Sequence, residues 1–199
     1  NGITENKILE EIYNGLERDS LDLADDERSY KIAFRGLKYF SKIIDGENVQ
    51  NDSLADFYFY FSREFLVVQN KSGYESLKSR GLETIKKDSL RSSIIDLYEV
   101  DYEKSRKFNE EYREYKFMDN YFHKINEVLA PNFEYDETNN IKGIKLPIDI
   151  NEKERSLIKS YLWKIADGKQ DLYQGAKYDK EKIGKLRTDI KKYLDNKSK

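Results

Sequence analysis

The sequence contains no cysteine, and only 2 proline and 10 glycine residues among its 199 positions. The lack of cysteine excludes a disulfide framework, a thiolate zinc site, an iron–sulfur cluster and a cysteine nucleophile. Hydrophobic residues nevertheless make up 38% of the chain, with 16 tyrosines and 10 phenylalanines, which is more apolar material than disordered chains carry. We therefore expect a folded protein whose core needs neither a metal nor a disulfide.

The sequence also lacks an excess of one charge and a long apolar run. Its 36 Lys and Arg residues against 38 Asp and Glu residues give a net charge of −2, which argues against a nucleic-acid binder. The longest unbroken apolar run is Phe57-Tyr58-Phe59-Tyr60-Phe61, far short of the roughly 18 to 20 residues that span a bilayer. Because the chain opens at Asn1 without a signal-peptide pattern, we expect it to be a fragment whose original N-terminus is missing.

Apolar residues recur at helical spacing through most of the chain, which predicts an all-α fold. A first long helix is expected from residue 4 to about 45, with a kink or frayed turn between Leu16 and Tyr30. An aromatic helix is expected from Asp52 or Ser53 to Val68. A further long helix is expected from about 89 to Pro131, on the seven-residue register formed by Ile94, Asp101, Phe108, Tyr115, Phe122 and Leu129.

The remaining segments complete a single domain over 1–199. Residues 131–150 are expected to be irregular or to form a small hairpin, and Asn151 with Glu154 makes a capping box for a helix that Gly168 ends. A last helix follows over 183–194. The predicted fold is an elongated antiparallel helical bundle, in which the first and third long helices are antiparallel and the aromatic helix covers their seam.

Gly81 is predicted to be a structural turn. Leu77 and Leu82 both need to face the core, yet five residues separate them by about 140° on a continuous helix. A glycine in the left-handed conformation after Arg80 would end one helical turn and let Leu82 face inward again.

No residue is predicted to be catalytic, to bind a cofactor or to hold a metal. The only histidine, His123, has no second histidine or cysteine to complete a metal site or a triad. The acidic run Asp19, Asp22, Asp25 and Asp26 fits a solvated helix face better than a cation-binding loop. Phosphate-binding loops and nucleophile motifs are also absent, so an enzyme is the minority hypothesis.

Asp101 is the most informative polar residue, since it occupies an inward register position where a carboxylate needs a partner. Arg91 and Arg106 are the expected partners, and such a pair would fix the packing register rather than perform chemistry. Trp163 is expected in the core, with an exposed position marking an interface instead.

Charge is distributed unevenly between the two ends of the chain. Residues 1–28 hold nine acids and three bases, whereas residues 180–199 hold eight bases and three acids. We interpret this asymmetry as complementarity to helix dipoles rather than as a functional basic tail.

Two stretches resemble a family of bacterial single-pass membrane-anchored proteins that have a domain of unknown function. They are the segment Tyr74-Glu75-Ser76-Leu77-Lys78-Ser79-Arg80-Gly81-Leu82 with 88–99, and the opening Ile8-Leu9-Glu10-Glu11-Ile12. The resemblance covers roughly residues 5–130 and implies a missing N-terminal membrane anchor, with this helical domain on the periplasmic or extracytoplasmic side. The first 20 residues contain only two basic residues, Lys7 and Arg18. Such a low count is expected for the outer flank of a membrane span, and it also suits any acidic helix start.

These observations predict a membrane-tethered extracytoplasmic interaction or sensory module without a cofactor. Its expected partner is a protein, with no nucleic acid, and self-association into a homo-oligomer is compatible with the sequence. The alternative is an unrecognised enzyme or small-ligand-binding domain with a polar cleft between helices. Convergent ionisable groups in a cleft would favour that alternative, and an exposed apolar patch would favour a protein partner.

Overall fold

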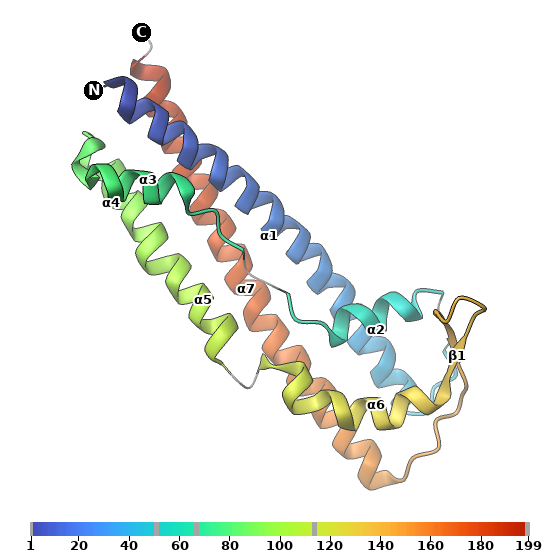
Figure 1. Ribbon diagram of the computed structural model, residues 1–199. Coiled ribbons are helices and arrows are strands. Elements are labelled where there is room, and N and C mark those ends of the chain that lie inside the picture. Colours follow the sequence, from blue (N-terminus) through green and yellow to red (C-terminus); the bar gives the residue numbers. More distant parts are fainter. Residues whose placement is uncertain (1, 50–51, 66–67, 113–114, 198–199) are drawn as a thin grey trace. The chain divides into compact units, whose positions relative to one another are not determined.

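The computed structural model describes residues 2–49, 52–65, 68–112 and 115–197. These residues are mostly helical, with 79% in helices, and they include one small two-stranded sheet (Figure 1). The two long helices are the N-terminal α1 (Gly2–Ile44) and the C-terminal α7 (Glu152–Lys197). None of the helices in the described part combines the length and apolar character needed to cross a membrane.

Shorter elements connect the two long helices. They are α2 (Leu54–Ser62), α3 (Ser72–Arg80), η1 (Leu82–Thr84), α4 (Asp88–Ile95), η2 (Asp96–Asp101), α5 (Tyr102–Glu111), η4 (Met118–Phe122), α6 (His123–Leu129), η5 (Ala130–Asn132), β1 (Phe133–Tyr135) and β2 (Ile141–Ile144). The elements η2 and η4 are π-helical, whereas η1 and η5 are 3-10 turns.

By its contacts the chain divides into two compact units. The first unit comprises 1–26, 66–111 and 174–199, and the second comprises 27–65 and 112–173. The long helices α1 and α7 each contribute one part to each unit.

The first unit has a core built by the N-terminal part of α1, the segment from α3 to α5 and the C-terminal part of α7. Its most completely buried residues include Leu9, Ile12, Leu16, Leu77, Ile85, Ile94, Tyr102, Ile183 and Ile190. The opposite charges of the two chain ends meet here, since Lys197 forms an ion pair with Glu5 and Arg187 lies 2.8 Å from Glu17. The charge asymmetry of the sequence is therefore partly neutralised within this unit.

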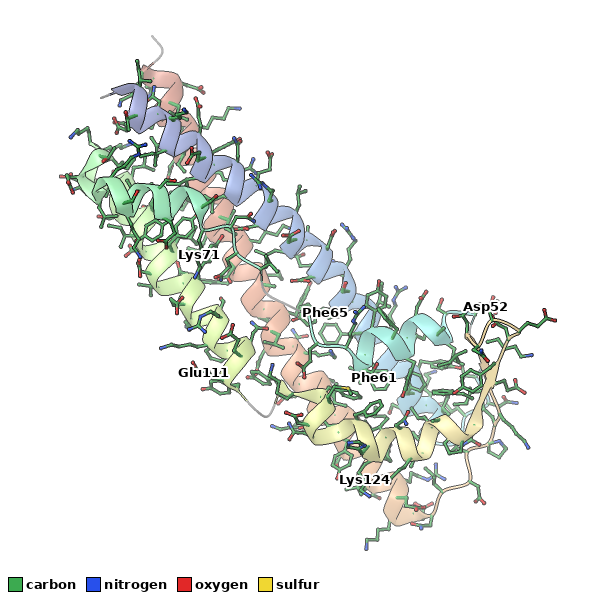
Figure 2. All side chains as sticks on the ribbon, viewed as in Figure 1. Asp52, Phe61, Phe65, Lys71, Glu111 and Lys124 are labelled. Carbon is green, nitrogen blue, oxygen red and sulfur yellow. The ribbon has the colours of Figure 1, made fainter. Side chains whose placement is uncertain are left out.

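The second unit has an aromatic core around α2. Phe61, labelled in Figure 2, lies on α2. It is fully buried, with its ring centroid 4.9 Å from that of Phe40 and 5.6 Å from that of Phe117. The aromatic helix ends at Ser62, earlier than the sequence predicts, and Phe65 lies beyond it in extended chain.

The start of α7 follows the predicted capping box. The Asn151 amide donates to Glu154 Oε2 and the Glu154 amide donates to Asn151 Oδ1, both at 3.0 Å. The hairpin expected within 131–150 is also present, with β1 paired antiparallel to β2 through Phe133 and Ile144.

Besides the earlier end of the aromatic helix, three features of the long helices differ from the sequence prediction. Helix α1 runs without a break through the acidic segment, because Asp19 is buried and hydrogen-bonded there. Helix α7 continues through Gly168, which lies against Tyr115: an added Cβ atom would stand 2.9 Å from the ring. The small size of Gly168 therefore serves packing rather than termination.

The third difference concerns the long helix expected from about 89 to 130. It is divided into α4, η2, α5, η4 and α6, and Tyr112 and Lys116 lie outside helices. Because each π-helical turn changes the rotation of the chain, the seven-residue register is not kept: Ile94 and Leu129 are buried, but Phe108 and Phe122 are only partly buried.

Gly81 lies between α3 and η1 with φ 92° and ψ 131°. Its positive φ places it among conformations that favour glycine. Its ψ differs from the roughly 47° of the left-handed helical conformation, which the sequence argument assumed.

Candidate functional site

The first unit contains a groove between η2 and α7. It has a volume of about 210 Å³ and is lined by Ser93, Asp96, Leu97 and Asp101 from α4 and η2 and by Lys182, Lys185, Leu186 and Asp189 from α7. Drug-sized ligands usually occupy pockets of about 300 to 1,000 Å³, so this groove fits a smaller molecule.

The π-helical turn η2 explains why two aspartates line this groove together. In an α-helix, residues five apart such as Asp96 and Asp101 would point about 140° away from each other. The wider turn of a π-helix hydrogen-bonds residue i to residue i+5 and so brings these positions onto one face. Such π-helical turns are frequently found at functional sites.

Asp101 forms an ion pair with Lys182 across the groove. The side chain of Asp101 is 14% exposed, and its carboxylate lies 3.8 Å from the Lys182 ammonium. A hydrogen bond with Tyr178 and the charge of Asp101 both raise the pKa of Lys182. Lys182 therefore carries a positive charge that is held on the α7 side of the groove.

A second carboxyl group, that of Asp179, is buried one turn before Lys182. Asp179 is 4% exposed, and its Oδ2 accepts a 2.5 Å hydrogen bond from the Ser105 hydroxyl. Burial raises the pKa of Asp179 to about 6, the Ser105 bond opposes this rise, and the negative charge of Asp101 adds to it. This buried carboxyl group, three residues before Lys182 on α7, therefore titrates close to the physiological range.

The two arginines predicted to pair with Asp101 do not do so. Arg91 donates to the Ile85 carbonyl at 2.8 Å and pairs with Asp88 at 2.7 Å. Arg106 pairs with Glu103 at 3.0 Å and also with Glu110. Arg91 is ten residues away, which is about 15 Å along a helix, and Arg106 is five residues beyond Asp101, so neither side chain shares its face.

Asp19 forms a second buried polar cluster in the first unit, which sequence reasoning missed. It is 2% exposed and accepts hydrogen bonds from the Asn70 amide at 2.9 Å, from Asn70 Nδ2 at 2.5 Å and from the Tyr102 hydroxyl at 2.5 Å. Burial and the charge of Asp19 raise the pKa of Tyr102. The signal was present in the sequence, because Asp19 lies three residues after Leu16 and four before Leu23, on the apolar stripe.

Tyrosine rings close this cluster off from solvent. Tyr74 stacks on Tyr98 with 4.5 Å between ring centroids, Tyr98 meets Tyr102 edge to face at 5.2 Å, and the Tyr74 hydroxyl donates to Glu99 at 2.8 Å. Because its acceptors are satisfied and covered, the Asp19 cluster acts as part of the core.

Lys169 is a buried cation in the second unit. Its ammonium donates to the Arg63 carbonyl at 2.8 Å and lies 5.0 Å from the centroid of the Phe65 ring. Burial lowers the pKa of Lys169 to about 8, against the opposing effect of the Glu64 charge. Lys169 is not among the residues that line the groove between η2 and α7.

The remaining sequence candidates lie at the surface. His123 is exposed at the start of α6 beside Phe122, and Trp163 is 66% exposed with the Lys164 ammonium 5.9 Å from its ring. Within the described residues, no group of three or more His, Cys, Asp or Glu side chains is arranged to hold a metal ion.

Fold and groove together define a mostly helical protein with a small charged cavity between η2 and α7. Comparisons of the chain with protein families, with curated proteins and with solved structures give no match.

Proposed function

We propose that this protein is a membrane-tethered extracytoplasmic sensory module that binds a small ligand in the groove between η2 and α7. The observation that carries the proposal is the convergence of five ionisable side chains, Asp96, Asp101, Lys182, Lys185 and Asp189, on one cavity of about 210 Å³. Cavities with a few convergent polar groups are where small ligands usually bind.

Binding accounts for the groove better than catalysis does. The only hydroxyl that lines it, that of Ser93, donates to the Ser89 carbonyl at 3.0 Å. Among the described residues, no general base lies within hydrogen-bonding distance of Ser93 as nucleophilic catalysis would require. The charged side chains instead suit the recognition of a charged ligand.

The proposal includes an antiparallel bundle of helices within the first unit. Two contacts support this arrangement, namely Ser105 with Asp179 and Asp101 with Lys182. From the first pair to the second, the residue number falls along η2 and α5 and rises along α7, as in antiparallel segments. This arrangement would place η2 and α7 side by side along the groove. A ligand held by both would change their relative packing, which is how a helical module transmits binding.

Placement outside the cytoplasm rests on the resemblance of residues 74–99 to membrane-anchored proteins. It can be tested with the full-length gene product in a bacterial host, by fusing alkaline phosphatase or green fluorescent protein to its C-terminus. We expect phosphatase activity from the first fusion and no fluorescence from the second, because the phosphatase is active only after export. A fluorescent, soluble fusion would contradict the tether and the placement.

The binding function can be tested by NMR with small charged solutes. We expect at least one cation, anion or zwitterion to shift amide signals of 93–101 and 182–189. Asp101→Asn should weaken the effect, whereas Asp195→Asn, on an exposed residue of α7 outside the groove, should leave it unchanged. If no solute shifts these signals at tens of millimolar, the groove is not a binding site.

A protein partner remains the second candidate, because Trp163 is 66% exposed on α7 in the second unit. Exposed tryptophans are over-represented among the residues that dominate protein interfaces. Since Trp163 is the only tryptophan, its fluorescence reports on this surface alone. A shift of its emission to shorter wavelength as protein concentration rises, reversed on dilution, would support self-association through this face.

A further inference from the structure

The charges of the groove are only partly balanced within the protein. Asp101 and Lys182 pair with each other, and the negative charge of Asp96 also acts on Lys182. Among the described residues, the side chains of Asp96, Lys185 and Asp189 form no hydrogen bond or ion pair. Two carboxylates and one ammonium are thus available to a ligand.

We infer that the ligand of the groove is a zwitterion of amino-acid size, with its ammonium beside Asp96 and Asp189 and its carboxylate beside Lys185. This inference rests on the proposed binding function and names the chemistry of the ligand. Each unpaired group of the groove then meets an opposite charge, and the net charge of the site changes little on binding.

The placement of the groups on α7 supports a ligand with both charges. Lys185 and Asp189 are four residues apart on α7 and so lie one above the other, with about 5 to 6 Å between their Cβ atoms. A ligand that carried only positive charge would be attracted by Asp189 but repelled by Lys185. A ligand that carried only negative charge would be attracted by Lys185 but repelled by Asp189 and Asp96.

The size of the groove favours a small zwitterion over a nucleotide or a peptide. Its volume of about 210 Å³ lies below the roughly 300 to 1,000 Å³ of pockets that hold drug-sized ligands. Below it lie Leu97 and Leu186, both buried, so the groove is closed underneath by apolar side chains.

The test uses three probes that differ by one charged group: L-alanine, ethylamine without the carboxylate, and propionate without the ammonium. Each is titrated at pH 7 and constant ionic strength while amide signals of 93–101 and 182–189 are followed. We expect L-alanine to bind with a dissociation constant on the order of 1 mM. Ethylamine and propionate should each bind at least about tenfold more weakly.

Two variants separate the roles of the charges. Lys185→Gln should remove the preference for L-alanine over ethylamine, because only the carboxylate contact is lost. Asp189→Asn should weaken L-alanine and ethylamine together, and Asp195→Asn should change neither.

The outcomes also separate this inference from the proposed function. If ethylamine or propionate binds as tightly as L-alanine, the ligand class is wrong while the groove remains a binding site. If none of the probes shifts the signals of the groove although another charged solute does, the zwitterion is again wrong. If no solute of any charge binds there, both proposals fail.

Discussion

The hydroxyl of Tyr102 donates a 2.5 Å hydrogen bond to the carboxylate of Asp19, a residue 83 positions away in the sequence. Both side chains are almost completely buried. The bond joins α5 to α1 and, with the two hydrogen bonds from Asn70, fixes the carboxylate of Asp19 inside the core of the first unit.

Removing Asp19 should therefore be costly. Asp19→Ala leaves the Tyr102 hydroxyl and two donors of Asn70 without their acceptor, and we expect a loss of about 3 kcal/mol or more in the free energy of unfolding. Tyr102→Phe removes one donor and should cost about 1.5 to 3 kcal/mol. Chemical denaturation measures both.

A control on the same helix distinguishes this cluster from general helix effects. Asp22 is exposed, so Asp22→Ala should change stability by no more than about 0.5 kcal/mol. The double variant of Asp19 and Tyr102 should lose less than the sum of the single losses, because the two side chains contact each other. Strict additivity would show that the hydrogen bond contributes nothing to stability.

Asp179 makes stability depend on pH. Because its pKa is raised from 3.8 to about 6, the folded protein binds a proton that the unfolded chain has already released in this range. Its favourable contribution is complete below about pH 4 and is lost as pH rises through about 6. Two pKa units correspond to about 3 kcal/mol, at 1.36 kcal/mol for each unit.

Asp179→Asn tests this dependence, since an asparagine Oδ1 can still accept the Ser105 hydrogen bond. Relative to the natural protein, the variant should gain up to about 3 kcal/mol in stability between pH 4 and pH 7.5. Asp195→Asn, on an exposed residue, should show no such trend. Parallel curves for Asp179→Asn and the natural protein would rule out a raised pKa.

Phe61 and Phe59 offer a matched comparison on α2. Phe61 is fully buried among aromatic rings, so Phe61→Ala should cost about 3 to 5 kcal/mol. Phe59 is 45% exposed, with the Arg63 guanidinium 4.4 Å from its ring centroid, and its replacement by alanine should cost less than about 1.5 kcal/mol. Equal losses from urea unfolding would mean that α2 does not present one inward face.

Local patterns explain which parts of the fold the sequence predicts. The period of apolar residues indicates α1, and Asn151 with Glu154 marks the start of α7, because both features act within a few residues. Both depend on interactions along one segment of chain. The hairpin after Pro131 is likewise a local feature.

The candidate site depends on features that no local period reveals. The partner of Asp101 is Lys182, which lies far along the chain, so only the packing of η2 against α7 brings them together. The π-helical turn that aligns Asp96 with Asp101 is not visible in the seven-residue pattern, which predicts a regular helix through this segment. The prediction that a helix ends at Gly168 was wrong for a similar reason, since the contact of Gly168 with Tyr115 is tertiary.

Gly81 should tolerate neither alanine nor asparagine. Its φ of 92° with ψ of 131° lies outside the left-handed helical region in which asparagine is accepted. We expect Gly81→Ala and Gly81→Asn each to lower the free energy of unfolding by at least about 1 kcal/mol. A mild effect of asparagine with a strong effect of alanine would indicate the left-handed helical conformation instead.

Gly73 sets how closely α3 approaches α1. A Cβ atom added at Gly73 would stand 2.7 Å from the Ile12 amide nitrogen and 2.9 Å from the Glu11 carbonyl carbon. These are backbone atoms of a long helix, so they cannot turn aside as the end of a side chain could. The glycine is therefore required by the contact between the two helices and not by its own dihedral angles.

The same substitution should have opposite effects at Gly73 and at Gly175 of α7, where an added Cβ atom would meet nothing within 4 Å. Gly175→Ala should raise stability by about 0.5 to 1 kcal/mol, because alanine is the better helix former. Gly73→Ala should lower it by about 1 to 3 kcal/mol, because α3 must move away from α1 and the buried Tyr74 and Leu77 lose their packing. Thermal and chemical unfolding of the two variants give the sign of each change in the free energy of unfolding. A stabilised Gly73→Ala protein would mean that α3 does not lie against α1 at this distance.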